Sequence, residues 1–205
     1  IEALIKSYNV PSVKLGMAVG LDEVAHTINR LGVDKDITKV PALTLGAIDL
    51  SVLQVNQMYQ TIANNGVLNK LHSLTAVTSN ENELLYLRDV KSEIRADESA
   101  TYLINYALHK VTLEGTASAV RKAFPNINMA GKTGTTNDYR DSWFAGFDRN
   151  LVTAVWMGSD DNSPINLSGA SGAMQVFIAF QEKQSPKNLS RRFPEGLGIA
   201  HFDAH

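Results

Sequence analysis

The sequence has 205 residues, of which 44% are hydrophobic and 20% charged, a composition that fits one globular domain or a small pair of domains. Its formal net charge is −2 and no basic or acidic block runs along the body, which excludes the electrostatic footprint of a nucleic-acid-binding protein. The absence of cysteine excludes disulfides and thiolate metal sites, and it fits a periplasmic protein as well as a cytosolic one.

The opening stretch, "IEALIKSYNV", contains no initiator methionine, basic segment or cleavage site. We therefore expect a piece cut from a longer protein. Helical spacing of apolar residues predicts two helices near the start, over residues 12–20 and 21–31, and the second ends at Gly32. A capping box formed by Ser51 and Gln54 predicts another helix. The apolar face predicted for that helix consists of Leu53, Met58, Ile62 and Ala63.

Residues 73–88 place two β-favouring runs around a polar Asn-Glu-Asn turn, which predicts a hairpin. A long helix is predicted over residues 97–113, because apolar residues recur along one side before Gly115. The members of that side are Leu103, Tyr106, Ala107 and Val111.

From residue 128 onward the apolar period changes from that of helices to that of strands. Three strands are predicted, in "NMAGKTGTT", "DSWFAGF" and "LVTAVWMGS", with residues 148–150 as the turn between the last two. Since "LVTAVWM" is apolar on both faces, we expect it to be a central strand. A last helix is predicted in "GASGAMQVFIAFQEK", with a stripe of Met174, Phe177, Ile178 and Gln181.

Helices followed by antiparallel strands and a closing helix predict an α+β fold. We expect a helical lobe over about residues 1–127, the strands and last helix over about 128–183, and a polar C-terminal tail over 184–205. His201 and His205 lie four residues apart near Asp203 in this tail, where a disordered end is favoured over a metal site. The sequence predicts no metal site.

The stretch "MAGKTGTT", residues 129–136, carries the most specific motif. A phosphate-binding loop is a weak interpretation, because the residues before Gly131 contain no glycine and no helical pattern follows Thr133. The alternative is the K-T-G-[ST] signature of penicillin-recognising serine enzymes, which should occur by chance only ~0.007 times in such a chain. Its partner motif S-x-N occurs once, at Ser7 to Asn9, well before Lys132 as in that superfamily, although alone it would be a turn or helix cap.

Five longer stretches of the sequence resemble a known protein family. "SYNVPSVKLGMAVGL", "PALTLGAIDLSVLQVNQMYQTIANNG", "EGTA", "NINMAGKTGTTNDYRDSWFAGF" and "GASGAM" resemble, in this order, the C-terminal part of the transpeptidase domain of class A, bifunctional penicillin-binding proteins, most closely the 1b type of Gram-negative bacteria. The resemblance implies the penicillin-binding and serine β-lactamase fold, incomplete at its N-terminus, with residues 1–183 forming a partial transpeptidase domain.

The same resemblance implies roles for the motif residues. Lys132 would supply positive field beside Ser7. Ser7 would relay a proton between the catalytic lysine, which belongs to the family's S-x-x-K motif, and the leaving nitrogen, and Asn9 would bind the substrate backbone. Thr133 and Thr135 would bind the substrate carboxylate, and the Thr135 N–H would be one oxyanion donor. Gly134, which lacks a β-carbon, would let the acyl group lie flat along the strand. Acyl transfer needs such groups beside an activated serine.

The nucleophile motif S-x-x-K is absent: the nearest candidate, Ser118, has Arg121 in place of the lysine, and arginine stays protonated at working pH. In the family this motif precedes S-x-N, together with the first strands of the sheet. We therefore expect a second polypeptide, or an N-terminal segment outside this chain, to complete the domain and to pair with the exposed edge of "LVTAVWM".

The resulting prediction is a serine-type D,D-transpeptidase domain fragment that acts on D-Ala-D-Ala stem peptides of peptidoglycan, is acylated by β-lactams, needs no cofactor and is inactive alone. The resemblance implies a parent with a glycosyltransferase domain and a membrane anchor, at the periplasmic face of the bacterial inner membrane. Two alternatives stay open: a β-lactamase or D,D-carboxypeptidase of the same superfamily, and a non-catalytic penicillin-sensing or scaffolding domain.

Overall fold

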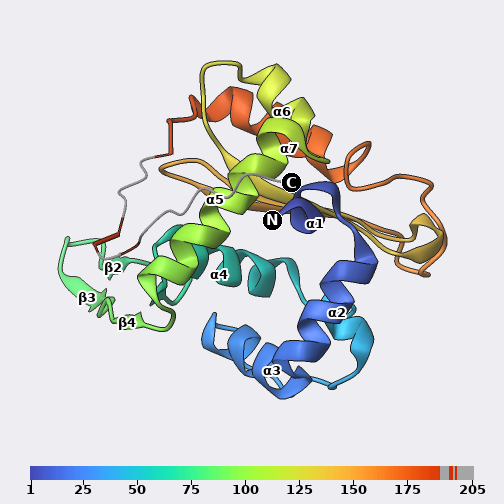
Figure 1. The fold of residues 1–205 in the computed structure, drawn as a ribbon. Helices are drawn as coiled ribbons and strands as arrows, with labels where there is room; N and C mark the ends of the chain where they lie inside the picture. Colours follow the sequence, from blue (N-terminus) through green and yellow to red (C-terminus); the bar gives the residue numbers. More distant parts are fainter. Residues whose placement is uncertain (190–193, 196, 198–205) are drawn as a thin grey trace. The chain divides into compact units, whose positions relative to one another are not determined.

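The computed structural model describes residues 1–189, 194, 195 and 197, which form two compact units (Figure 1). Unit 1 contains Ile1–Ser7 and the residues from Asp97 onward, and unit 2 contains Tyr8–Ala96. The elements of unit 2 are α2 (Asn9–Val19), α3 (Leu21–Arg30), η1 (Pro41–Leu45), α4 (Val52–Ala63), β1 (Val67–Asn69), β2 (Ala76–Thr78), β3 (Leu84–Leu87) and β4 (Ser92–Ile94). Those of unit 1 are α1 (Glu2–Lys6), α5 (Glu98–Glu114), α6 (Ser118–Ala123), β5 (Ala130–Thr135), η2 (Asn137–Tyr139), β6 (Ser142–Phe147), β7 (Val152–Met157) and α7 (Ala173–Gln184).

Helices combined with antiparallel strands confirm the predicted α+β class. The unit boundaries follow packing rather than element type, so the expected division near residue 127 stays a prediction. Throughout the part of the chain described here, each helix is too short or too polar to span a membrane.

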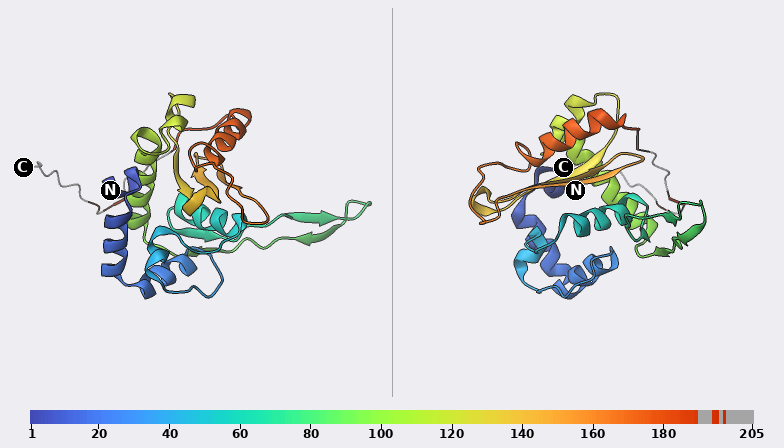
Figure 2. Two further views of the ribbon diagram at one scale, coloured as in Figure 1. Left: turned by 90° about the vertical axis from the view of Figure 1, so that its right-hand side faces the viewer. Right: turned by 180° about the vertical axis from the view of Figure 1, so that it is seen from behind.

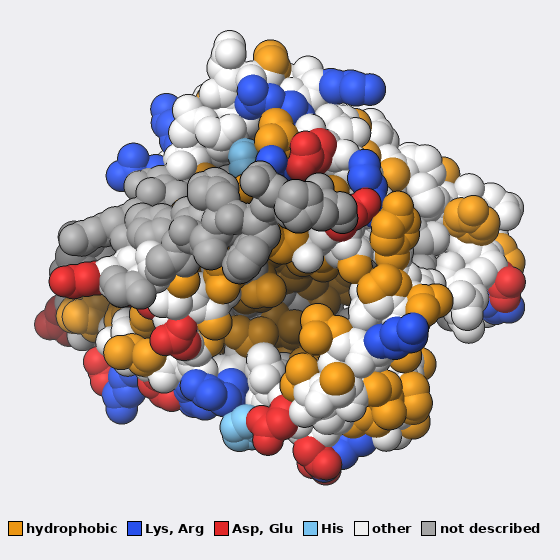
Figure 3. Space-filling model, viewed as in Figure 1, with side chains coloured by type: hydrophobic (Ala, Val, Ile, Leu, Met, Phe, Trp, Pro, Cys, Tyr) orange, Lys and Arg blue, Asp and Glu red, His pale blue; other side chains and the backbone are white. Residues whose placement is uncertain are grey.

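The first two helices of unit 2 agree with the sequence pattern, except that α2 begins at Asn9 rather than Ser12. Gly32 follows α3 with a φ of 109°, a left-handed conformation that favours glycine at a helix end. Helix α2 buries none of its residues, and apolar side chains gather over it in Figure 3. Its exposed apolar residues are Val10, Leu15, Met17 and Val19.

Helix α4 begins with the predicted capping box: Ser51 Oγ accepts from the Gln54 N–H at 3.2 Å, and Gln54 Oε1 accepts from the Ser51 N–H at 2.9 Å. The predicted apolar face is wrong at Leu53, which is 66% exposed, whereas Met58, Ile62 and Ala63 are partly buried. The most buried residues of the helix are the polar Gln57 and Thr61. Burial of these polar residues is stabilised by hydrogen bonds to the backbone of other segments, including one from Thr61 Oγ1 to the Leu31 carbonyl at 3.0 Å.

The hairpin predicted over residues 73–88 is present as β2 and β3, which pair antiparallel with a register shift between Val77 and Thr78. It extends as a narrow ribbon in the left view of Figure 2, and all residues of both strands are exposed. Strands β1 and β4 form a separate antiparallel pair.

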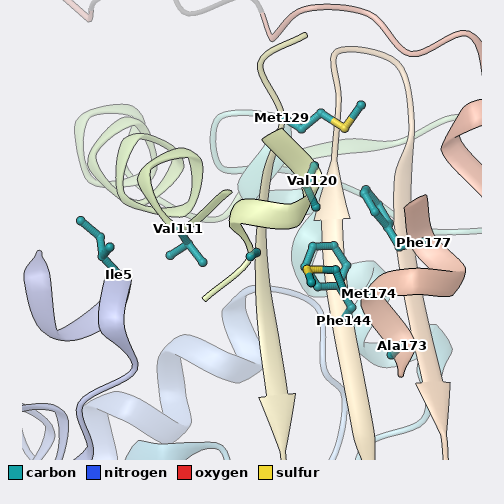
Figure 4. Close-up of a cluster of buried hydrophobic side chains, with 9 residues drawn as sticks. Ile5, Val111, Val120, Met129, Phe144, Ala173, Met174 and Phe177 are labelled. Atoms are coloured by element: carbon teal, nitrogen blue, oxygen red, sulfur yellow. The ribbon is translucent and has the colours of Figure 1, made fainter. Parts of the chain in front are cut away.

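The core of unit 1 gathers side chains from α1, α5, α6, β6 and α7 (Figure 4). Phe144 and Phe177 are both fully buried, and their ring centroids lie 4.6 Å apart. Helix α5 contributes Val111, which is also fully buried, but the predicted Leu103 is 49% exposed. The other buried members of this core are Ile5, Ala117, Val120, Met129, Ala173 and Met174.

The sheet of unit 1 has the antiparallel order β5-β6-β7. Among the described residues β7 lies at an edge, as expected if the first strands of the sheet lie outside this chain, and β6 is central and buries Phe144 to Phe147. The central position expected for "LVTAVWM" in the complete sheet stays a prediction. Residues of β7 are only partly buried, although α7 packs against this strand. In α7 the predicted stripe is confirmed, since Met174, Phe177 and Gln181 are buried.

Candidate functional site

Ser7 and Lys132, which are 125 positions apart in the sequence, meet in unit 1. Lys132 lies on β5, and its Nζ donates to Ser7 Oγ at 2.5 Å and to the Thr133 carbonyl at 3.0 Å. Ser7 ends α1 in the left-handed region, with φ 57° and ψ 44°. A serine rarely adopts this conformation, and such strain is concentrated at functional sites. Two residues predicted from separate motifs therefore form one contact.

Burial sets the electrostatics of this pair. Lys132 is partly buried, and desolvation lowers the pKa of its ammonium from 10.5 to about 8. Lys132 therefore stays mostly protonated at neutral pH, but it releases its proton more readily than a solvated lysine does.

The backbone of β5 has an open edge on the side away from β6. The N–H of Thr136, which follows β5, donates to the carbonyl of Asp141, which precedes β6, at 3.2 Å. Because backbone groups of successive residues in a strand point to opposite edges, the N–H groups of Thr133 and Thr135 point away from β6. Among the described residues no strand pairs with that edge.

The hydroxyls of Thr133 and Thr135 each have an inner partner. Thr133 Oγ1 lies 2.9 Å from Thr116 Oγ1, and Thr135 Oγ1 accepts from the Gly169 N–H at 2.8 Å. A β-carbon on Gly134 would lie 3.0 Å from Trp143 Cβ, so a close approach to β6 favours glycine here. The predicted benefit of Gly134 for a bound acyl group stays a prediction.

The other candidate sites in the sequence are Asn9, a phosphate-binding loop and a histidine pair. Asn9 belongs to unit 2, at the start of α2, so its substrate contact stays a prediction. Residues 130–135 form a strand and not a loop that opens a helix, which removes the phosphate-loop interpretation. Among the described residues no cluster of potential metal ligands occurs, while His201 and His205 lie outside them.

The sequence patterns did not predict the contacts that Thr116 and Gly169 make with β5. Both lie in blocks that carried the family resemblance, "EGTA" and "GASGAM", but nothing in their local sequence indicates a contact with β5. Their partners are 17 and 34 positions away.

Comparisons with known proteins agree with one another. The family model described as "Penicillin binding protein transpeptidase domain" matches residues 1–177. The chain is 43% identical to penicillin-binding protein 1B of Vibrio cholerae over 98% of its length and 41% identical to that of Escherichia coli K12 over 99%. It covers only 26% and 24% of those relatives, so it spans about a quarter of their length.

Solved structures share the fold. Penicillin-binding protein 1A of Haemophilus influenzae superposes with a TM-score of 0.86 at 23% identity, over 94% of this chain and 35% of that one. An imipenem acyl-enzyme complex of penicillin-binding protein A from Mycobacterium tuberculosis superposes with a TM-score of 0.68 at 19% identity, over 88% of this chain and 47% of that one.

Proposed function

Because this chain belongs to the penicillin-binding protein transpeptidase domain family, we propose that it forms part of a serine-type D,D-transpeptidase that cross-links peptidoglycan stem peptides and is acylated by β-lactams. The observation that carries the proposal is the contact between Lys132 Nζ and Ser7 Oγ beside the open edge of β5. An acyl-transfer site needs such a proton path next to hydrogen-bond donors for the substrate.

Ser7 and Lys132 relay a proton in this proposal. The Lys132 ammonium donates to Ser7 Oγ, and the Ser7 hydroxyl donates its own proton to the leaving nitrogen of the D-Ala-D-Ala bond. A lysine whose pKa is about 8 is suited to this relay, because general acid catalysis works best near the operating pH. The positive charge also attracts the substrate carboxylate.

The strand β5 receives the substrate along its open edge. The outward N–H of Thr135 donates to the oxyanion that develops during acyl transfer, and the hydroxyls of Thr133 and Thr135 donate to the terminal carboxylate. Asn9 binds the substrate backbone. Residues on rigid strands hold this geometry better than residues on loops do.

A segment outside this chain supplies the nucleophile and its general base. The 205 residues contain no S-x-x-K motif, and in the described structure β7 has a neighbour on one side only. We propose that the N-terminal remainder of the domain, either on the same polypeptide or as a separate chain, pairs with β7 and carries the serine. The whole protein would act at the periplasmic face of the inner membrane, held by its own anchor, and would carry a glycosyltransferase domain.

The test uses the full-length protein that contains this chain. With a stem-peptide donor and an amine acceptor, the wild type should form cross-linked product, and Lys132→Ala should lose about 10²–10³-fold in rate. Lys122→Ala is the matched control, because Lys122 is an exposed lysine of unit 1 and should change the rate little. Hydrolysis without transfer would favour the carboxypeptidase or β-lactamase alternative, and absence of any reaction would favour a sensing or scaffolding role.

A further inference from the structure

Thr116 lies between the two segments that carry the proposed catalytic pair. It follows α5, and its backbone N–H donates to the Ile5 carbonyl at 3.3 Å, close to the end of α1 where Ser7 stands. Its side-chain Oγ1 lies 2.9 Å from Thr133 Oγ1 on β5. One partly buried residue thus contacts both α1, at whose end Ser7 lies, and β5, the strand that carries Lys132.

The turn around Thr116 is held tightly. A β-carbon on Gly115 would lie 2.5 Å from the Ile5 carbonyl oxygen and 2.9 Å from Val111 Cα, so the backbones approach as closely as glycine permits. Lys6 Nζ donates to the Glu114 carbonyl at 3.3 Å, which adds a second bond between α1 and the end of α5. These close backbone contacts with α1 fix the position of Thr116, whose hydroxyl contacts Thr133.

Counting protons fixes the direction of the hydroxyl contact when a carboxylate is bound. An ionised carboxylate only accepts hydrogen bonds, and a threonine hydroxyl has a single proton. If Thr133 donates to a carboxylate, the proton between the two threonines must come from Thr116. Thr135 has the equivalent arrangement, since its oxygen accepts from the Gly169 N–H and its proton is left for a ligand.

We propose that Thr116 is a positioning residue for carboxylate recognition: its hydroxyl donates to Thr133 Oγ1 and so turns the Thr133 proton towards the terminal carboxylate of the acyl donor. This role rests on the proposed transpeptidase function. A chain of hydrogen bonds that ends on a charged acceptor strengthens each member, so the contribution of Thr116 depends on the charge of the ligand.

The experiment measures acylation of the full-length protein by benzylpenicillin and by its methyl ester, followed by intact mass. Thr116→Val keeps the shape and the backbone bond to Ile5 but removes the hydroxyl, and it should slow acylation by benzylpenicillin roughly tenfold while leaving the slower reaction of the ester unchanged. Thr116→Ser restores the hydroxyl and should recover most of the rate. In a Thr133→Val background, Thr116→Val should cause no further loss with benzylpenicillin, because the two residues act through one proton.

Equal slowing with both probes would overturn the proposal, since it would indicate general damage to the site, and so would an unchanged rate with benzylpenicillin. Thermal unfolding of each variant shows whether the fold is retained, and Thr116→Ser keeps the test decisive if Thr116→Val unfolds. Failure of the wild type to react with either probe would overturn the proposed function itself, and this role with it.

Discussion

Replacing Lys132 by methionine should stabilise the folded protein near neutral pH while it abolishes the proposed activity. The pKa of Lys132 is lowered from 10.5 to about 8 by desolvation, and each pKa unit corresponds to about 1.4 kcal/mol, so the buried charge costs about 3 kcal/mol at pH 7. Methionine removes that cost but loses the bonds to Ser7 Oγ and the Thr133 carbonyl, at about 1 kcal/mol each. The expected net gain is about 1 kcal/mol.

The pH dependence of the stability difference shows whether the buried charge of Lys132 causes it. Because the folded pKa lies below the unfolded one, the cost is fully present below pH 8 and decreases as the pH rises from 8 to 10.5. At pH 9.5 the cost of burying the Lys132 charge falls to about 1.5 kcal/mol. The free energy of unfolding of Lys132→Met minus that of the wild type should therefore be about 2 kcal/mol lower at pH 9.5 than at pH 7. Urea unfolding at both pH values measures it. A difference that does not change with pH would show that the buried ammonium of Lys132 does not destabilise the fold.

Three further substitutions test the fold. Gly115→Ala should lower the free energy of unfolding by about 1–3 kcal/mol, because its β-carbon would meet the backbones of Ile5 and Val111; a thermal midpoint equal to wild type would contradict this. Ser51→Ala should lower the free energy of unfolding in urea by about 1 kcal/mol, because it removes the acceptor of the Gln54 N–H. An unchanged free energy of unfolding would show that the capping box does not stabilise the fold. Gln181→Met should change stability by less than ~1 kcal/mol, because Gln181 is fully buried, its Oε1 has no partner among the described residues, and methionine loses only the long bond from Gln181 Nε2 to Thr153 Oγ1 at 3.4 Å. A loss above ~2 kcal/mol by calorimetry would contradict this.

Features that depend on neighbouring residues could be predicted from the sequence. The capping box at Ser51, the hairpin over residues 73–88 and the strand that carries Lys132 all follow from short patterns, and all are present. The family blocks also gave the correct fold class, and Ser7 and Lys132, which the resemblance placed side by side, are in contact.

Features that depend on contacts between distant segments could not be predicted from the sequence. Leu53 and Leu103 satisfy the helical period yet point to solvent, whereas Thr61 is buried because the Leu31 carbonyl, 30 residues away, accepts its hydroxyl proton. Apolar residues on both faces of β7 predict a central strand, but the strand order of the complete sheet depends on which segments pair with it. Thr116 was missed for the same reason, since its hydroxyl contact is made across a turn, a helix and a strand.

In the proposed enzyme this chain holds the proton relay and the carboxylate-binding strand, while the nucleophile lies elsewhere in the protein. Peptide mapping by mass spectrometry, after the full-length protein has reacted with benzylpenicillin, tests this most directly. We expect the drug on a serine in the sequence that precedes Ile1, with every peptide of these 205 residues unmodified. Attachment to Ser7, or to any other serine of this chain, would contradict it.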